Sequence, residues 1–204
     1  MGDRYGPMVV ALEPFPEAQL REKKIAIPGE TTSAFLALKI FLGTDQFNYV
    51  VVPFDKIMDE VKEGRADCGL LIHEGQLTFE GEGLVNIVNL GEWWYQHTDG
   101  LPLPLGANVV RKAFGKDVMS RINRVTKRSI EYALVPENRQ EAVRYSLFWA
   151  RGMTEELADE FVGMYVNDLT RDFGERGRAA VERFLREGYE LGFLPEPVEL
   201  DLGT

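Results

Sequence analysis

Hydrophobic and polar positions follow two different spacings along this chain. In the first half, short apolar runs alternate with stretches whose apolar residues recur every three or four positions. The short runs are typical of buried strands, and the longer spacing is typical of helices with one covered face. This alternation indicates crossover connections and a largely parallel sheet, with the last strand at an edge. The predicted strands are residues 8–11, 24–27, 49–52, 68–73 and 84–90, and the predicted helices are residues 34–42 and 55–63.

The second half has helical spacing throughout. Residues 100–106 separate the two halves as a stiff connector, because two prolines there force an extended backbone. Thr154 precedes two glutamates and is a candidate N-cap. These helices have little sheet on which to pack, so part of an α/β lobe is expected to be absent. The predicted helices are residues 116–134, 137–151, 154–165 and 175–190.

Composition narrows the class of protein. The chain has 204 residues, 45% of them hydrophobic and 27% charged, which suits one globular domain or two small lobes. Its net charge of -10 argues against nonspecific binding to nucleic acid or to an anionic membrane. The single cysteine, Cys68, excludes an intramolecular disulfide and is expected to be a small buried residue. No apolar run fits a membrane span and no signal-peptide pattern is present, so a cytoplasmic location is expected.

His73 ends an apolar run and is a candidate for chemistry. Strands of an α/β sheet end at the crevice where ligands bind, and an imidazole there can act as a general base near neutral pH. The alternative, a hydrogen-bonded structural histidine, is favoured by the residues alone. His97 follows Trp93-Trp94-Tyr95 on a helical stretch and is expected to pack or to face solvent. Two distant histidines and a lone cysteine form no ligand pattern, so no metal site is predicted.

Residues 28–33 form a turn with three hydroxyls between a predicted strand and a predicted helix. Backbone N–H groups at a helix N-terminus are unpaired and the helix dipole favours negative charge there. Thr32 and Ser33 could therefore help to hold a carboxylate or a phosphate. The alternative, that one of them only caps its own helix, is the more common arrangement.

Five motifs carry a resemblance that runs the length of the chain. They are Gly2-Asp3-Arg4-Tyr5-Gly6-Pro7, Ile27-Pro28-Gly29 with Thr32-Ser33-Ala34, Gly69-Leu70-Leu71-Ile72-His73-Glu74, Leu90-Gly91-Glu92-Trp93-Trp94, and Gly100-Leu101-Pro102-Leu103-Pro104-Leu105-Gly106. In this order and spacing they resemble the 1,4-dihydroxy-6-naphthoate synthase family, which belongs to the futalosine route of menaquinone biosynthesis.

The resemblance implies an α/β fold like the type II periplasmic binding proteins, with two lobes that close on a small-molecule substrate. It implies a carbon–carbon lyase without a cofactor, which cleaves cyclic dehypoxanthinyl futalosine to 1,4-dihydroxy-6-naphthoate and dihydroxyacetone. The family's proton-accepting histidine falls on His73. Its substrate-binding Thr-Thr-Ala step falls on Thr32, Ser33 and Ala34, where serine replaces the second threonine and keeps the hydroxyl.

The chain departs from the family at its front. Family members have several tens of residues before the Gly-Asp-Arg-Tyr-Gly-Pro motif, and these carry the opening strands of the first lobe. We therefore expect residues 8–107 to form a complete α/β lobe with the His73 strand. Residues 1–7 and 108–204 would be the mostly helical remainder of a first lobe that is incomplete at its N-terminus, as in a fragment or a chain with a misassigned start.

Two other functions fit the same fold. Chorismate dehydratase acts in the same pathway, but the Ile-His-Glu and Gly-Leu-Pro-Leu-Pro-Leu-Gly segments look more like the naphthoate synthase. A non-catalytic solute-binding protein is favoured by the fold and disfavoured by a histidine at the cleft. The sequence leaves the oligomeric state open.

Overall fold

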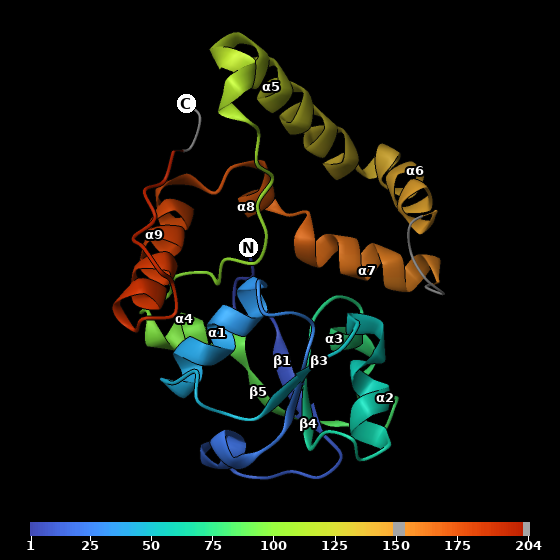
Figure 1. The fold of residues 1–204 in the computed structure, drawn as a ribbon. Helices are drawn as coiled ribbons and strands as arrows, with labels where there is room; N and C mark the ends of the chain where they lie inside the picture. The colour runs from blue at the N-terminus through green and yellow to red at the C-terminus, as the bar shows by residue number, and fades with distance from the viewer. Residues whose placement is uncertain (149–153, 202–204) are drawn as a thin grey trace. The chain divides into compact units, whose positions relative to one another are not determined.

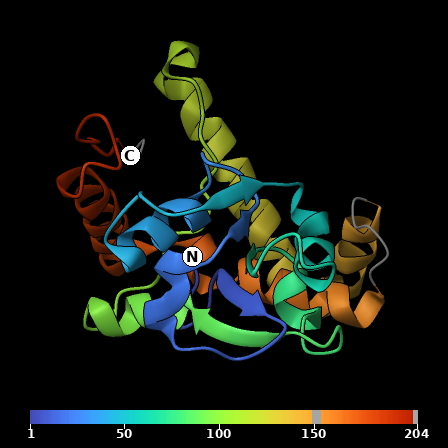
Figure 2. The same cartoon turned by 60° about the horizontal axis from the view of Figure 1, so that its bottom comes forward.

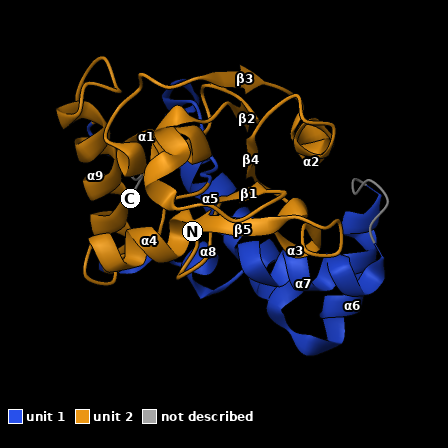
Figure 3. Ribbon diagram, turned by 90° about the horizontal axis from the view of Figure 1, so that it is seen from below, with its two compact units in different colours: residues 1, 106–175, 199–204 blue, residues 2–105, 176–198 orange. Residues whose placement is uncertain are grey.

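The computed structural model describes residues 1–148 and 154–201 and divides the chain into two compact units. Unit 2 consists of residues 2–105 and 176–198, and unit 1 consists of Met1 with residues 106–175 and 199–204 (Figure 3). Each unit is described here by itself. The division into a lobe of residues 8–107 and a second lobe of residues 1–7 and 108–204 stays a prediction.

Unit 2 is built around a five-stranded sheet with the strand order β3-β2-β4-β1-β5. The predicted strands are confirmed, and the last of them lies at an edge as expected. Figure 2 shows β1 and β5 next to one another. The strands are β1 (Met8–Ala11), β2 (Ile25–Ile27), β3 (Tyr49–Val51), β4 (Cys68–Leu71) and β5 (Val85–Asn89).

The sheet is mixed, which corrects the prediction of a largely parallel sheet. Strand β2 is parallel to β3 and to β4, whereas β1 is antiparallel to both β4 and β5. The four residues of β1 are all buried. A fully apolar run of this length looks the same for either direction of the strand, so the sequence pattern could not reveal the reversal.

Helices cover both faces of this sheet (Figure 1). Val9 belongs to an apolar cluster with residues of α1 (Ser33–Leu42), α4 (Leu90–His97) and α9 (Gly174–Glu190). Its neighbour Val10 points to the other face, into a cluster with α2 (Ile57–Lys62). Unit 2 therefore has a core on each side of its sheet. The shorter elements of this unit are η1 (Glu17–Glu22), η2 (Phe54–Lys56) and α3 (Gly75–Thr78).

The ends of the predicted helices are marked by the expected residues. Gly43 follows α1 with φ 64°, and Gly64 follows the α2 segment with φ 69°, a left-handed conformation that glycine adopts without a steric penalty. Thr154 caps the helix that begins at Glu155, because its side chain accepts a hydrogen bond from the Leu157 N–H. These local signals confirm the boundaries that the sequence predicts.

Unit 1 contains helices and, among its described residues, no strand. Residues 149–151 of the predicted helix 137–151 lie outside the described residues. No helix in residues 1–148 or 154–201 is both long and apolar enough to cross a membrane. The elements of unit 1 are η3 (Lys112–Phe114), α5 (Gly115–Leu134), α6 (Pro136–Leu147), α7 (Glu155–Tyr165) and α8 (Asp168–Arg171).

Candidate functional site

The candidate site lies at the edge of the sheet where β2, β3 and β4 end. These three strands run in the same direction, so the residues that follow them emerge on one side. The turn that leads to Thr32 follows β2, Phe54 follows β3, and His73 follows β4. Strands β2 and β4 are direct neighbours, with Ala26 opposite Gly69. The fold thus brings the predicted substrate-binding turn and the predicted base to adjacent strand ends.

His73 is exposed and has a left-handed backbone, with φ 58°. Its carbonyl accepts a hydrogen bond of 3.2 Å from the Gln76 N–H, which begins the turn into α3. Its ring lies against Phe54, with the ring centroids 4.5 Å apart and the planes inclined by 48°. Histidine tolerates the left-handed region better than most residues, and non-glycine residues in this region cluster at functional sites. The left-handed backbone is therefore a second feature, besides the position at a strand end, that supports a functional role for His73.

Thr32 is the N-cap of α1, and its hydroxyl is used inside the turn. The Thr32 hydroxyl accepts a hydrogen bond of 3.1 Å from the Phe35 N–H and donates one of 2.8 Å to the Gly29 carbonyl. The capping role that the sequence left open for this residue is thus the observed one. The observed bonds leave the hydroxyl with little capacity to donate to a ligand.

Ser33 and Ala34 occupy the first turn of α1. The Ser33 hydroxyl donates a hydrogen bond to the Leu105 carbonyl and so ties the helix to the end of the proline-rich connector. Ala34 is buried. The N–H groups of both residues lie in the first helical turn, where backbone N–H groups have no partner within the helix and the helix dipole is positive. Backbone N–H groups, more than hydroxyls, are what this turn can offer to an anion.

The Gly2–Pro7 motif and the connector of residues 100–106 meet beside this edge. Gly2 and Leu103 exchange two backbone hydrogen bonds, of 2.9 and 2.8 Å. Gly91, at the start of α4, lies so close to the main chain that a Cβ would fall 2.0 Å from the Tyr5 carbonyl. A Cβ at Gly2 would likewise fall 1.9 Å from the Tyr5 carbonyl oxygen, so these two glycines allow the close approach of backbone segments.

Three charged residues hold the Gly2–Pro7 motif in place through ion pairs and hydrogen bonds. Asp3 forms a bidentate ion pair with Arg176, at 2.7 and 3.0 Å, and Arg176 also donates to the Gly100 carbonyl. The hydrogen bonds from Arg176 hold the pKa of the Asp3 carboxyl below its usual value. Arg4 donates to the Tyr95 hydroxyl at 3.0 Å and lies over its ring. These partners could not be predicted from the sequence, because Arg176 is 173 residues from Asp3 and no nearby pattern signals the pairing.

The other candidates from the sequence are structural. Cys68 is buried, and burial raises the pKa of its thiol to about 12, so the thiol is neutral and inert, as predicted. His97 is exposed, forms a hydrogen bond of 3.0 Å with Glu187 and stacks on Trp93, which agrees with the predicted packing or solvent-facing position. Trp94 is fully buried. Within the described residues, no cluster of three His, Cys, Asp or Glu side chains could hold a metal ion.

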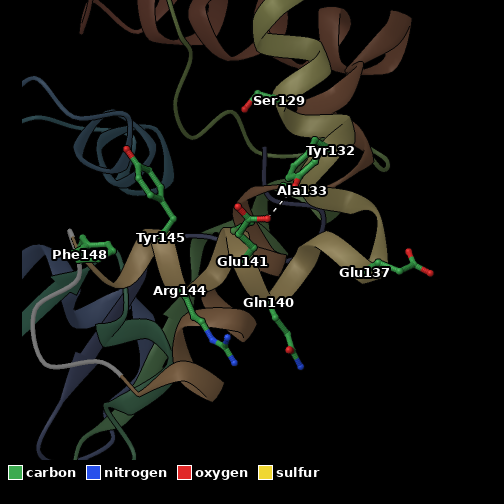
Figure 4. A pocket seen from close by; sticks show the side chains of 10 residues that line it. Ser129, Tyr132, Ala133, Glu137, Gln140, Glu141, Arg144, Tyr145 and Phe148 are labelled. Carbon is green, nitrogen blue, oxygen red and sulfur yellow. Dashed lines mark hydrogen bonds between the residues drawn. The ribbon is translucent and has the colours of Figure 1, made fainter.

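A depression of about 680 Å³ lies in unit 1, between α5 and α6 (Figure 4). Tyr132 of α5 donates a hydrogen bond of 2.9 Å across it to Glu141 of α6. Neither His73 nor any residue of the Thr32–Ala34 turn lines this depression.

Comparison with known proteins shows the family to which the chain belongs. The model of a protein family described as menaquinone biosynthesis matches residues 1–190. The chain belongs to this family. A protein of Streptomyces coelicolor named 1,4-dihydroxy-6-naphthoate synthase is 34% identical over 96% of the chain and 69% of its own length. A Thermus thermophilus protein of the same name is 36% identical over 97% of the chain and 70% of its own length.

Solved structures confirm the expected fold. The crystal structure of protein AF1704 from Archaeoglobus fulgidus is similar with a TM-score of 0.87 and 38% identity, over 95% of this chain and 70% of that one. A periplasmic sulfonate-binding protein from Methylobacillus flagellatus is similar with a TM-score of 0.60 and 15% identity, over 97% of this chain and 62% of that one. The second similarity concerns the fold alone, which is that of the periplasmic binding proteins, as the motifs implied.

Proposed function

We propose that the chain acts as a carbon–carbon lyase of menaquinone biosynthesis, with His73 as the proton acceptor. The reaction is cleavage of cyclic dehypoxanthinyl futalosine to 1,4-dihydroxy-6-naphthoate and dihydroxyacetone. The family and the names of two curated relatives support this lyase over chorismate dehydratase and over a non-catalytic solute-binding protein. The observation that carries the proposal is the position of His73, in a left-handed turn at the end of β4 and next to the strand that leads into α1.

The roles of the other residues follow from their contacts. The Ser33 and Ala34 N–H groups bind the carboxylate of the substrate at the positive end of α1. Thr32 positions both N–H groups, because its capping hydrogen bonds fix the start of the helix. His73 accepts a proton as the carbon–carbon bond breaks, which is the role of a general base. The proposal includes a cytoplasmic location and no cofactor.

Replacing His73 with alanine tests the proposal. The variant and the wild-type chain are incubated with cyclic dehypoxanthinyl futalosine, and the naphthoate product is measured by liquid chromatography and mass spectrometry. We expect kcat to fall by about 10²- to 10⁴-fold, the usual contribution of a general base, while KM changes little. His97→Ala is the matched control and should keep wild-type turnover, because His97 stacks on Trp93 and is hydrogen-bonded to Glu187.

Three outcomes would contradict the proposed role of His73 or the proposed reaction. Unchanged turnover in His73→Ala would remove this residue from the mechanism. Tight binding of substrate without turnover would favour a solute-binding protein. Dehydration of chorismate would favour the sister enzyme.

A further inference from the structure

The Tyr49 hydroxyl donates a hydrogen bond of 2.9 Å to the carboxylate of Glu30. Tyr49 begins β3, and Glu30 lies in the turn between β2 and α1, so the bond joins segments that are 19 residues apart. Strand β3 is the neighbour of β2 in the sheet (Figure 3). Glu30 is exposed and Tyr49 is half-buried. Because a hydrogen bond in contact with water contributes only modestly to stability, the main effect of this bond is to fix the position of the Glu30 carboxylate.

Aromatic contacts hold the Tyr49 side chain in place. Its ring lies against Phe35 and Phe47, with the ring centroids 5.0 and 5.6 Å apart. Phe35 is buried, and its N–H is the group that Thr32 caps at the start of α1. The Tyr49 hydroxyl therefore has a defined position relative to the first turn of α1. The hydrogen bond to Glu30 raises the pKa of the Tyr49 phenol above its usual value, so the phenol stays protonated and donates at neutral pH.

The position of Glu30 gives its carboxylate a way to compete with an anionic ligand. Glu30 precedes the cap residue Thr32 by two positions. A carboxylate near a helix N-terminus is attracted by the helix dipole and by N–H groups that have no partner within the helix. A glutamate side chain released from Tyr49 is long enough to approach the Ser33 and Ala34 N–H groups from this position. It would then repel a second carboxylate from the same groups, because the two charges are alike.

We propose that the Tyr49 hydroxyl is a positioning group, which holds the Glu30 carboxylate away from the N–H groups at the start of α1 and so keeps them open to the substrate. This inference rests on the proposed function, which assigns the substrate carboxylate to the Ser33 and Ala34 N–H groups. Tyr49 acts through Glu30 and takes no part in the proton transfer. Its effect therefore falls on ligand binding, whereas that of His73 falls on the chemical step.

Binding of a carboxylate probe tests the proposal without turnover. The probe is 1,4-dihydroxy-6-naphthoate, the product of the proposed reaction, kept under anaerobic conditions. The amide resonances of Ser33 and Ala34 in proton–nitrogen NMR report its binding. Tyr49→Phe keeps the ring and removes the hydroxyl, so it should raise the dissociation constant about fivefold, the usual effect of one charge at a helix end. In this variant the same resonances should be shifted before the probe is added, because the Glu30 carboxylate then lies near them.

Removing the charge of Glu30 separates this role from packing. The double variant Tyr49→Phe/Glu30→Gln has no competing carboxylate and should bind the probe as tightly as the wild type does. A purely structural role of Tyr49 would not be rescued by Glu30→Gln. Tyr132→Phe is the matched control, because Tyr132 donates a bond of the same length, 2.9 Å, to Glu141 in unit 1. This control should leave the dissociation constant unchanged.

Steady-state kinetics give a second readout. With cyclic dehypoxanthinyl futalosine as substrate, Tyr49→Phe should raise KM about fivefold and leave kcat close to the wild-type value, because it weakens binding and leaves His73 intact. His73→Ala is expected to have the opposite effect, with a lower kcat and little change in KM. The two variants therefore distinguish a group that keeps the binding site open from the general base.

Three results would overturn the proposal. One is that the probe fails to shift the Ser33 and Ala34 amides of the wild-type chain. Another is that Tyr49→Phe binds the probe as tightly as the wild type does. The third is that Tyr49→Phe/Glu30→Gln binds as weakly as Tyr49→Phe, which would mean that lost packing weakens binding. A wild-type chain that binds the probe at these amides without turning over the substrate would instead reject the proposed reaction, and the three binding comparisons would still decide the role of Tyr49.

Discussion

Gly91 shows at the scale of one residue why the motifs contain glycine. A Cβ at this position would lie 2.0 Å from the Tyr5 carbonyl and 2.5 Å from the Gly6 nitrogen. Gly91→Ala should therefore destabilise unit 2 by about 1–3 kcal/mol, the usual cost of forcing atoms into a packed site. Urea unfolding followed by tryptophan fluorescence measures this. Gly106→Ala is the control, since no atom lies within 4 Å of a Cβ there, and equal effects of the two changes would contradict the argument.

Phe54 lies against His73 and should fix the orientation of its imidazole. With two histidines in the chain, proton NMR can follow each ring separately. We expect Phe54→Leu to shift the His73 ring resonances, because the ring 4.5 Å away is lost, and to leave those of His97 in place. The same variant should reduce kcat more than it raises KM. Phe54→Tyr keeps the ring and should keep both properties, and an unmoved His73 signal in Phe54→Leu would contradict the contact.

Residues of the site differ in how far the sequence could predict them. The strand end at His73 and the cap at Thr32 depend on neighbours a few positions away, so local patterns reveal them. The contact of Phe54 with His73 and the ion pair of Asp3 with Arg176 join distant segments, and only the folded chain shows them. The roles of His73, Ser33 and Ala34 in binding and catalysis stay predictions that their positions support.

At the scale of the element, the start of α1 depends on one side chain. Thr32→Ala removes the acceptor for the Phe35 N–H and the donor to the Gly29 carbonyl, so it should destabilise unit 2 by about 1 kcal/mol. Thr32→Ser keeps the hydroxyl and should leave the stability close to that of the wild type, because serine is at least as good an N-cap as threonine. Chemical denaturation of both variants measures the difference. Equal loss in the two would show that the methyl group, rather than the cap, stabilises the helix.

Elements with a clear pattern were predictable, and their pairing was only partly so. Apolar runs and glycine stops place β2, β4 and α1 within a residue or two of their observed bounds. The prediction of a largely parallel sheet was wrong for β1, because a strand can pair with β4 in either direction and the four buried residues of β1 carry no alternation that would distinguish the two. Strand direction is thus a property of the chain path, which local patterns do not contain.

At the scale of the whole molecule, the uneven distribution of buried side chains predicts two separate unfolding transitions. Unit 2 has a core on both faces of its sheet, whereas unit 1 buries little beyond Val143 and Ala158 among its described residues. Units with such different cores should not unfold together, since cooperativity requires shared buried surface. In a Trp149→Phe variant the remaining tryptophans, Trp93 and Trp94, both belong to α4 of unit 2.

Urea titration of this variant, followed by two probes, tests that expectation. Far-UV circular dichroism should lose helical signal at low urea, because α5, α6 and α7 of unit 1 melt first. Tryptophan fluorescence should change only at higher urea, when the core around Trp94 opens. Coincident transitions would show that unit 1 is stabilised to the same degree as unit 2.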